Sequence, residues 1–408
     1  MKTGVIMNII GIIAEYNPFH QGHQYQLDYV RKDLNADYII IAMSGDFVQR
    51  GVPALLPKHV RTEMALRCGA DLVLELPVSF STASAETFAM GGVSLFHGLG
   101  VIDSLCFGSE NGEVRELQAL AEILIHEPGD YKAQLKKLLK TGLSFPAARS
   151  LALKGYFDDA GSILSTPNNI LGIEYCKALL RLKSNIQPVT LKRTGADYHQ
   201  LAIKKNQLPS ASAIRRFFQA GNLPEDLEGM LPEVCLSIME NARLHNEFIC
   251  ENDFDLLLSY RLLNETTESL LQYADMSADL AARIISRRNQ FQSFMQFTDI
   301  LKTKELTRTR IQRALLHTVL GTREIPQILP YGRILGFRRE AAPLLKRIKA
   351  ETSIPVIAKA ADAASLLSES ALPVWRENVL ASNIYESVLS NKTKKAFVHE
   401  YKKQLVII

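Results

Sequence analysis

The sequence predicts an α/β protein: a doubly wound parallel-sheet domain followed by a mostly helical C-terminal domain. Three observations lead to this prediction. Apolar runs alternate with helical patterns in the first half, which is typical of parallel strands covered on both faces. After about Leu231 the strand patterns give way to apolar residues at helical spacing. The chain has 408 residues, more than one core usually holds, so we expect domains at 1–245 and 246–408.

The apolar runs of the first half are separated by segments long enough for crossover helices. They predict strands at Ile9–Ala14, Tyr38–Met43, Asp71–Leu76, Val101–Gly108 and Gln187–Arg193.

Helical spacing marks the second half, although Ile354–Ala360 resembles another strand. The expected helical segments are 233–249, 277–291 and 304–320. In the third segment, an inward stripe is predicted for Ile311, Ala314, Leu315 and Thr318.

Composition excludes several classes of protein. The 47 basic and 43 acidic residues give a net charge of +4, a slight preference for polyanions. Five dispersed cysteines without a C-x-x-C pair argue against a disulfide framework and a zinc site. No apolar run is long enough to span a bilayer, and the N-terminal run is interpreted as a strand, so we expect a cytoplasmic protein without membrane contact.

The segment "EYNPFHQGH" (15–23) follows the first predicted strand and precedes a helical pattern. Ligands of open parallel sheets bind where strands lead into helices, and a helix N-terminus favours phosphate. His20 and His23 can donate hydrogen bonds to phosphate, and Gly22 leaves room for close approach. The alternative is that both histidines cap a helix in an ordinary loop.

A second anion-binding arrangement is predicted in "LPSASAIRRFF" (208–218). Ser210 and Ser212 place hydroxyls at a helix start, and Arg215 follows one turn later. Many helices open with serine and carry a solvated arginine, so this pattern alone is a weak indication of an anion site. Together with the histidine segment it is a stronger one.

Longer blocks accompany the H-x-G-H motif at 11–27, 43–77, 106–113, 165–179 and 191–199, with a looser match at 304–317. With these blocks the chain resembles the H-x-G-H nucleotidyltransferase superfamily and, more closely, the bacterial tRNA(Met) cytidine acetate ligase family. The resemblance implies that ATP and acetate form acetyl-adenylate, and that acetyl is transferred to N4 of the wobble cytidine, position 34, of elongator tRNA(Met). Metal-ligand spacing is absent from the sequence, so we expect no metal site on the protein and Mg²⁺ that arrives with ATP. No obligatory protein partner is evident.

The resemblance also implies the site residues. His20, His23 and Lys58 are the expected catalytic residues, with Arg61 beside them; the alternative for Lys58 and Arg61 is a solvated helix face. Gly108 alternatively serves as a turn glycine, and Asn169 as a helix N-cap. The expected ATP-binding residues are Ile13, Ala14, Glu15, Tyr16, Asn17, Pro18, Phe19, His20, Gln21, Gly22, His23, Gln24, Tyr25, Gln26, Gly108, Asn169, Arg193, Ser212 and Arg215.

Basic residues on the predicted C-terminal helices are the candidates for RNA contact, because phosphate contacts provide most of the affinity for RNA. They are Arg287, Arg288, Arg308, Arg310 and Arg313. A solvated helix face is the alternative for each. Two other functions remain open: a small-molecule adenylyltransferase or acid–amine ligase resembling pantothenate synthetase, and an RNA-binding module with an inert pocket.

Overall fold

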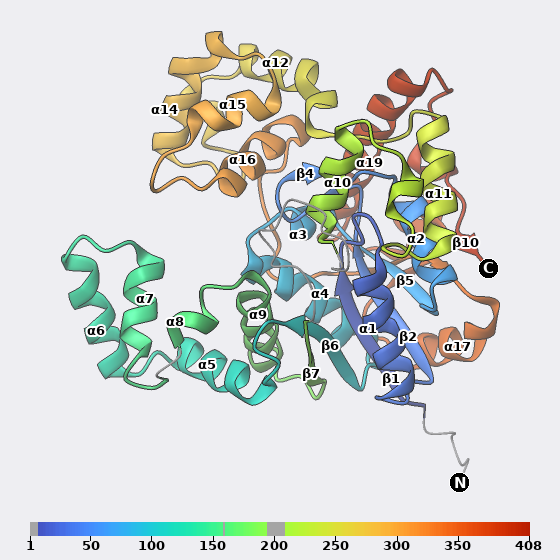
Figure 1. The fold of residues 1–408 in the computed structure, drawn as a ribbon, viewed down its shortest axis with the longest axis horizontal. Helices are drawn as coiled ribbons and strands as arrows, with labels where there is room; N and C mark the ends of the chain where they lie inside the picture. Colours follow the sequence, from blue (N-terminus) through green and yellow to red (C-terminus); the bar gives the residue numbers. More distant parts are fainter. Residues whose placement is uncertain (1–6, 158–159, 194–208) are drawn as a thin grey trace.

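The computed structural model describes residues 7–157, 160–193 and 209–408. Its main sheet has the strand order β10-β8-β5-β2-β1-β6-β7, with β9 beside β8 (Figure 1). The strands are β1 (Ile9–Ala14), β2 (Tyr38–Ser44), β5 (Leu72–Leu76), β6 (Ser104–Ser109), β7 (Gln187–Lys192), β8 (Gly332–Phe337), β9 (Val356–Ile357) and β10 (Val406–Ile407). The five strands expected in the first half, and the sixth near residue 356, are therefore confirmed.

Strands β5, β2, β1, β6 and β7 are parallel, so their carboxyl ends lie at one edge of the sheet. Ile9 and Ile13 of β1 face one core, whereas Ile10 and Ile12 face another. Because side chains alternate along a strand, this division shows that both faces of the sheet are covered. The doubly wound prediction is confirmed.

Helices cover the two faces of the sheet. One core includes residues of α4 (Ala85–Leu99), α5 (Val114–His126), α9 (Pro167–Arg181) and α17 (Ala342–Glu351). The other includes residues of α1 (Gln21–Lys32), α2 (Lys58–Arg67), α10 (Ala211–Gln219) and α11 (Glu233–Leu244).

A helical part with its own core lies above the sheet in Figure 1. It contains α12 (Asp255–Asn264), α13 (Thr267–Leu270), α14 (Ala278–Arg287), α15 (Phe294–Leu301) and α16 (Arg308–Leu320), and α19 (Leu372–Thr393) packs against it. The stripe predicted on α16 is buried as expected.

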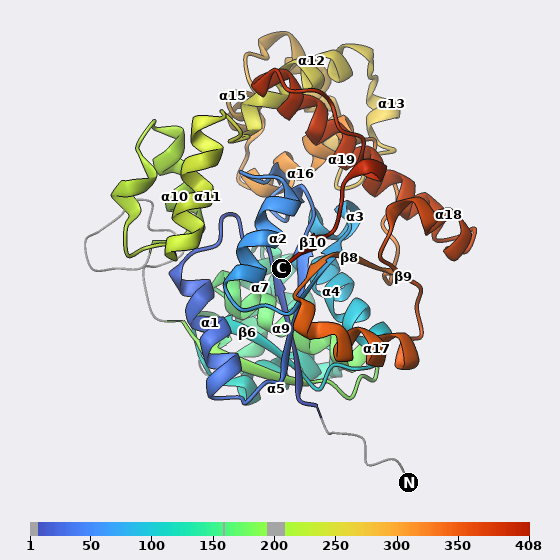
Figure 2. The ribbon, with the colours of Figure 1, turned by 90° about the vertical axis from the view of Figure 1, so that its right-hand side faces the viewer.

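The C-terminal segment returns to the sheet, which corrects the expected division at residue 245. Strand β8 pairs antiparallel with β5. Strand β10 lies beside β8 and pairs parallel with it (Figure 2). Residues 246–408 therefore do not form one helical domain. The sequence of β8, "GRILGF", contains two glycines and an arginine, and only two aliphatic residues follow each other, which weakens the strand pattern.

A tight turn of the sheet domain packs against the helical part. The hairpin of β3 (Phe47–Val48) and β4 (Val52–Pro53) turns through Gly51, which has a positive φ of 73°. A Cβ on Gly51 would lie 2.3 Å from the backbone nitrogen of Arg313 on α16. Only glycine therefore allows this hairpin to pack on α16.

Replacing Gly51 by alanine should lower the thermal midpoint more than the matched change Gly321→Ala. Both glycines have a positive φ, but a Cβ on Gly321 meets no atom within 4 Å. In the control variant Gly321→Ala, an alanine in a left-handed backbone conformation lowers the free energy of unfolding by about 1–2 kcal/mol. Gly51→Ala has the same loss and a further loss of about 1–3 kcal/mol from the steric clash. Thermal melting checks this, and equal midpoints would show that the close contact does not constrain the fold.

Candidate active site

A cavity of about 350 Å³ lies at the carboxyl ends of β1 and β6. The first residues of three helices line it: His20 and His23 at α1, Pro167 and Asn168 at α9, and Ser210 at the N-cap of α10. A helix N-terminus carries unpaired N–H groups and partial positive charge. The first N–H groups of α1 and α9 already donate to acceptors within the protein, and at α9 the acceptor is the carboxylate of Glu110. The helix starts therefore add partial positive charge to the cavity, which favours an anion such as phosphate.

The two histidines are held by reciprocal hydrogen bonds in the first turn of α1. The backbone N–H of Gly22 donates to Nδ1 of His20 at 3.0 Å, and the backbone N–H of His20 donates to Nδ1 of His23 at 3.2 Å. The two rings stack with their centroids 3.7 Å apart. Because each Nδ1 accepts a hydrogen bond, the proton of each neutral ring resides on Nε2. Each imidazole is therefore a single N–H donor in this cavity.

Both rings are neutral at physiological pH. Burial, with the nearby guanidinium groups of Arg193 and Arg215, lowers the pKa of His20 to about 3. Burial, the His20 ring and Arg193 hold the pKa of His23 well below its usual value. The cavity thus favours anions through arginines, helix ends and neutral donors.

Arginines add positive charge to the same cavity. Arg193 follows β7, and Arg215 lies on α10, where it donates to the backbone oxygen of Asn17 at 2.7 Å and to Oγ of Ser212 at 3.2 Å. Arg50, from the β3–β4 turn, also lines the cavity. The sequence therefore brings together cations from three separate segments.

Apolar side chains form another part of the wall. They are Ile13, Phe88, Phe107, Ile170, Leu171 and Tyr175. A cavity with a charged part and an apolar part can bind a ligand that has both phosphate and an aromatic ring.

Many of the predicted ATP-binding residues line this cavity. They are Ile13, Ala14, Glu15, Tyr16, Asn17, His20, His23, Gln26, Gly108, Arg193, Ser212 and Arg215.

Other predicted residues of the motif do not line the cavity. Phe19 is fully buried in the core below α1, whereas Tyr25 is 47% exposed. Gln24 donates hydrogen bonds to Asp28 and to the backbone oxygen of Cys68. Pro18 and Gln21 also lie outside the lining residues.

Gly22 and Asn169 support the site from outside the cavity. A Cβ on Gly22 would lie 2.9 Å from Cε1 of His20, so this glycine makes room for the imidazole instead of for a ligand. Oδ1 of Asn169 accepts hydrogen bonds from the backbone N–H groups of Glu110 and Asn111, at 3.0 Å each. Asn169 therefore fixes the loop after β6, and Thr166, not Asn169, is the N-cap of α9.

The structure places Lys58 in a buried ion network, not in the cavity. Its Nζ lies 2.6 Å from Oε1 of Glu75, 2.8 Å from Oε1 of Glu400 and 2.7 Å from Oγ of Ser382. Arg333 pairs with the same two glutamates. Burial opposes the charge of Lys58, but Glu400 and Glu75 raise the pKa of its ammonium above the usual value. The network joins α2 and β5 to the C-terminal segment.

Arg61 is also structural. Its guanidinium is fully buried and donates to the backbone oxygens of Leu56, Glu15, Ser44 and Gly45. These bonds hold the segments that follow β1 and β2. Neither a phosphate-binding role nor the solvated alternative describes Lys58 or Arg61, because burial decides how each cation is used.

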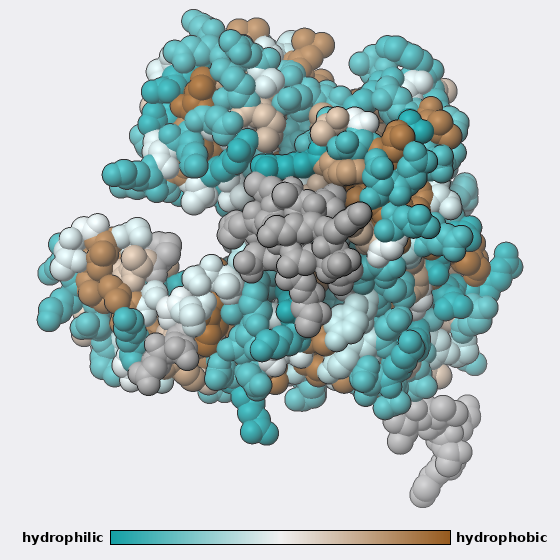
Figure 3. Space-filling model, viewed as in Figure 1, coloured by the Kyte–Doolittle hydropathy of each residue, from teal (hydrophilic) through white to brown (hydrophobic). Residues whose placement is uncertain are grey.

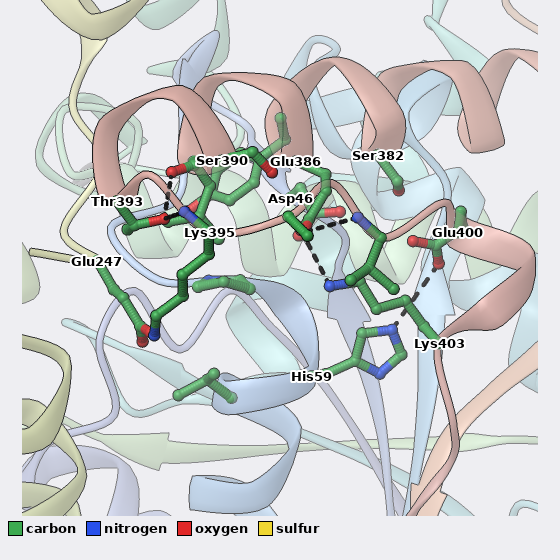
Figure 4. A pocket seen from close by; sticks show the side chains of 16 residues that line it. Asp46, His59, Glu247, Ser382, Glu386, Ser390, Thr393, Lys395, Glu400 and Lys403 are labelled. Atoms are coloured by element: carbon green, nitrogen blue, oxygen red, sulfur yellow. Dashed lines mark hydrogen bonds and ion pairs between the residues drawn. The ribbon is translucent and has the colours of Figure 1, made fainter. Parts of the chain in front are cut away.

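A second cavity of about 350 Å³ lies beside this ion network, between α2, α19 and the C-terminal tail (Figure 4). Its charged groups largely pair with each other: Lys395 with Glu247 at 2.5 Å and Lys403 with Glu386 at 2.9 Å. The charges of these two lysines are therefore compensated by carboxylates of the same cavity.

Sequence reasoning missed several residues of the site. Gln49 and Arg50 reach it from the β3–β4 turn, and Phe88 reaches it from α4. Arg50 within "SGDFVQRG" (44–51) could have been predicted as a site residue. It lies in a turn that follows a parallel strand, and ligands bind at the edge of the sheet where such strands end. Apolar wall residues such as Phe107 and Tyr175 cannot be distinguished from core residues by sequence.

The predicted RNA-binding arginines mostly make contacts within the protein. Arg287 donates to the backbone oxygen of Ile300, and Arg288 donates to that of Glu265. Arg308 lies 3.4 Å from Asp299, and Arg313 pairs with Asp275 at 2.9 Å. For Arg310 the described residues show no side-chain partner.

Comparisons with known proteins agree with this geometry. A family model for HIGH Nucleotidyl Transferase matches residues 7–400. The chain is thus a member of the HIGH nucleotidyl transferases.

Similar proteins narrow the family further. A tRNA(Met) cytidine acetate ligase of Acetivibrio thermocellus is 37% identical, over 98% of this chain and 100% of the relative. One of Clostridium perfringens is 40% identical, over 93% of this chain and 95% of the relative. The crystal structure of Thermotoga maritima TmcAL bound with alpha-thio ATP is 31% identical and covers 98% of this chain and 99% of that chain, with a TM-score of 0.89. The chain belongs to the tRNA(Met) cytidine acetate ligase family of HIGH nucleotidyl transferases.

Replacing Lys58 by methionine should destabilise the protein, because Glu75 and Glu400 would lose a buried counter-charge. Removal of one partner of a buried ion pair costs about 3–5 kcal/mol. The control Lys32→Met removes a lysine that is 74% exposed and should change stability by less than about 0.5 kcal/mol. Urea denaturation checks this. Unchanged stability would return Lys58 to the candidates for a direct role in the reaction.

The neutral state of His20 predicts a pH-dependent stability. Because the pKa is lower in the folded protein than in the unfolded chain, this group stabilises the fold fully above about pH 6.5, and the contribution is lost as pH falls toward 3. Between pH 6.5 and 5 the loss approaches about 2 kcal/mol. The variant His20→Asn keeps an N-cap acceptor without the titrating ring, so its stability should fall less over this range. Denaturation at both pH values checks this, and parallel losses would contradict it.

Proposed function

We propose that this protein is an ATP-dependent acetate ligase that forms acetyl-adenylate and acetylates N4 of the wobble cytidine, position 34, of elongator tRNA(Met). One observation carries the proposal: two neutral imidazole donors, three helix N-termini and three arginines line a single cavity. The names of the relatives and the ATP analogue of the Thermotoga maritima structure support the choice of substrates.

The first step joins two anions. A carboxylate oxygen of acetate attacks the α-phosphorus of ATP, the new P–O bond forms, and the bond to the departing pyrophosphate breaks. Negative charge must be neutralised while the reactants are aligned. The Nε2–H groups of His20 and His23 would donate to the phosphate under attack. Arg193 and Arg215 would bind the other phosphates, and the helix N-termini would add to the positive field.

In the second step, N4 of the cytosine attacks the carbonyl carbon of acetyl-adenylate. The C–N bond forms, AMP leaves, and the amine loses a proton. A cytosine can reach a cavity of this size only when its base is extruded from the anticodon stack. The apolar wall around Phe107 and Tyr175 offers a surface for the rings of the two nucleosides.

Mg²⁺ would arrive with the nucleotide, because this ion keeps several waters and binds phosphate oxygens. Within residues 7–157, 160–193 and 209–408, no group of three His, Cys, Asp or Glu residues could hold a metal ion.

The helices in the described part of the chain are too short or too polar to cross a membrane.

The decisive assay supplies ATP, labelled acetate and elongator tRNA(Met). Label should enter the tRNA, and His23→Ala should reduce acetate-dependent ATP–pyrophosphate exchange by about 10²–10³-fold, as loss of one donor to a developing charge does. His126→Ala, on an exposed turn of α5, is the control and should leave exchange unchanged. Exchange with another acid and no label in tRNA would favour a small-molecule ligase.

A further inference from the structure

A helical hairpin extends from the body of the protein ahead of α9 in the chain. It consists of α6 (Gly129–Lys140) and α7 (Phe145–Leu153) and lies across an open gap from the helical part of α12–α16 in the view of Figures 1 and 3. Tyr131, Ala152 and Leu153 are buried in the core on the α4–α9 side of the sheet, and Leu135 and Leu138 pack against it. One side of the hairpin therefore anchors it, and the other side faces solvent.

The hairpin carries the whole positive excess of the chain. Residues 129–157 contain six basic residues and one acid, a formal charge of +5. The rest of the chain has 41 basic and 42 acidic residues, a charge of −1. The single acid of the hairpin, Asp130, accepts a hydrogen bond from the hydroxyl of Tyr156.

Four lysines occupy the solvent side of α6. Lys132, Lys136 and Lys140 follow each other at intervals of four residues, and Lys137 lies next to this row. Lys132 is 3.5 Å from Glu127, but in the described chain no carboxylate lies within ion-pair distance of the other three. Like charges at this spacing destabilise a helix. Lys137 and Lys140 complement the helix dipole in the last turn of α6. Lys132 and Lys136 do not lie there, and the exposed row as a whole is well suited to a polyanion.

The position of the hairpin relates this charge to the cavity. The chain runs from α7 through α8 (Ala160–Ile163) to α9, and Pro167 and Asn168 at the start of α9 line the cavity. An RNA whose base enters the cavity must place its neighbouring phosphates outside the cavity, near the elements that surround it. Of the arginines expected to meet that backbone on α14 and α16, Arg313 forms an ion pair with Asp275 and Arg308 an exposed pair with Asp299. Arg287 and Arg288 donate to backbone oxygens.

We infer that the α6–α7 hairpin is an RNA-docking arm, whose lysines bind the phosphate backbone of the substrate tRNA while its target base occupies the cavity. This inference rests on the proposed function. It assigns tRNA affinity to the lysines within residues 132–140. On α16, Arg310 stays a candidate for RNA contact, because the described residues show no side-chain partner for it. Phosphate contacts by lysines set affinity and salt dependence and do not enter the chemistry of adenylate formation.

The tip of the hairpin also exposes apolar side chains. Phe145 is 54% exposed, with the guanidinium of Arg149 5.9 Å from its ring centre, and Leu139 and Leu143 are partly exposed nearby. Lysines beside exposed apolar residues also suit an anionic membrane surface. The connection to the cavity wall favours RNA, and membrane binding becomes an outcome of the test.

The test replaces three unpaired lysines together: Lys136→Gln, Lys137→Gln and Lys140→Gln. The control variant, Lys32→Gln, Lys359→Gln and Lys402→Gln, removes the same net charge from exposed positions elsewhere. Binding of elongator tRNA(Met) is measured over a range of salt concentrations. Acetate-dependent ATP–pyrophosphate exchange and binding to phosphatidylglycerol vesicles are measured in parallel.

The hairpin variant should bind tRNA at least about tenfold more weakly at moderate salt, with a salt slope smaller by about two to three. Its exchange activity should equal that of the wild type, and the control should bind tRNA normally. Equal tRNA affinity of the two variants overturns the docking arm, even if acetylation proceeds and the proposed function stands. Lysine-dependent vesicle binding with unchanged tRNA affinity overturns it in favour of a membrane surface. A wild-type protein without adenylate formation defeats the proposed function itself.

Discussion

The candidate active site depends on the reciprocal hydrogen bonds between two imidazoles and the first turn of α1. These bonds use Nδ1 of His20 and of His23 as acceptors, so they fix the tautomer, the ring positions and the start of the helix together. Gly22 contributes by having no Cβ where the His20 ring lies. The donors are thus arranged before any ligand arrives, and preorganised donors need no rearrangement when charge develops on a phosphate.

Burial divides the cations of this protein into three functions. Lys58, Arg61 and Arg333 are buried and hold strands, loops and the C-terminal segment together. Arg193 and Arg215 line the cavity, where an anionic substrate would meet their guanidinium groups. The lysines of α6 are exposed, and three of them have no carboxylate partner among the described residues, so their charge acts on the surroundings. Residues of the same type thus hold the fold together where they are buried and, in the functions we propose, would bind substrate or RNA where water reaches them.

The strands of the first half were predictable because each is a continuous apolar run, and H-x-G-H located the cavity because it follows the first of them. The uses of Lys58, Arg61 and Arg313 were not predictable, since a buried helical cation and a solvated one have the same local pattern. Strand β8 was missed because two glycines and an arginine leave only two consecutive aliphatic residues in it, and its pairing with β5 joins residues more than 250 positions apart. The docking arm could have been noticed from charge alone, but only the fold shows which lysines are exposed.

The most direct test of the central claim is a crystal structure of this protein with a non-hydrolysable ATP analogue. The α-phosphate oxygens should lie within hydrogen-bond distance of Nε2 of His20 and His23, and the other phosphates should lie beside Arg193 and Arg215. A triphosphate bound outside the cavity, or both imidazoles donating to protein atoms instead, would contradict it.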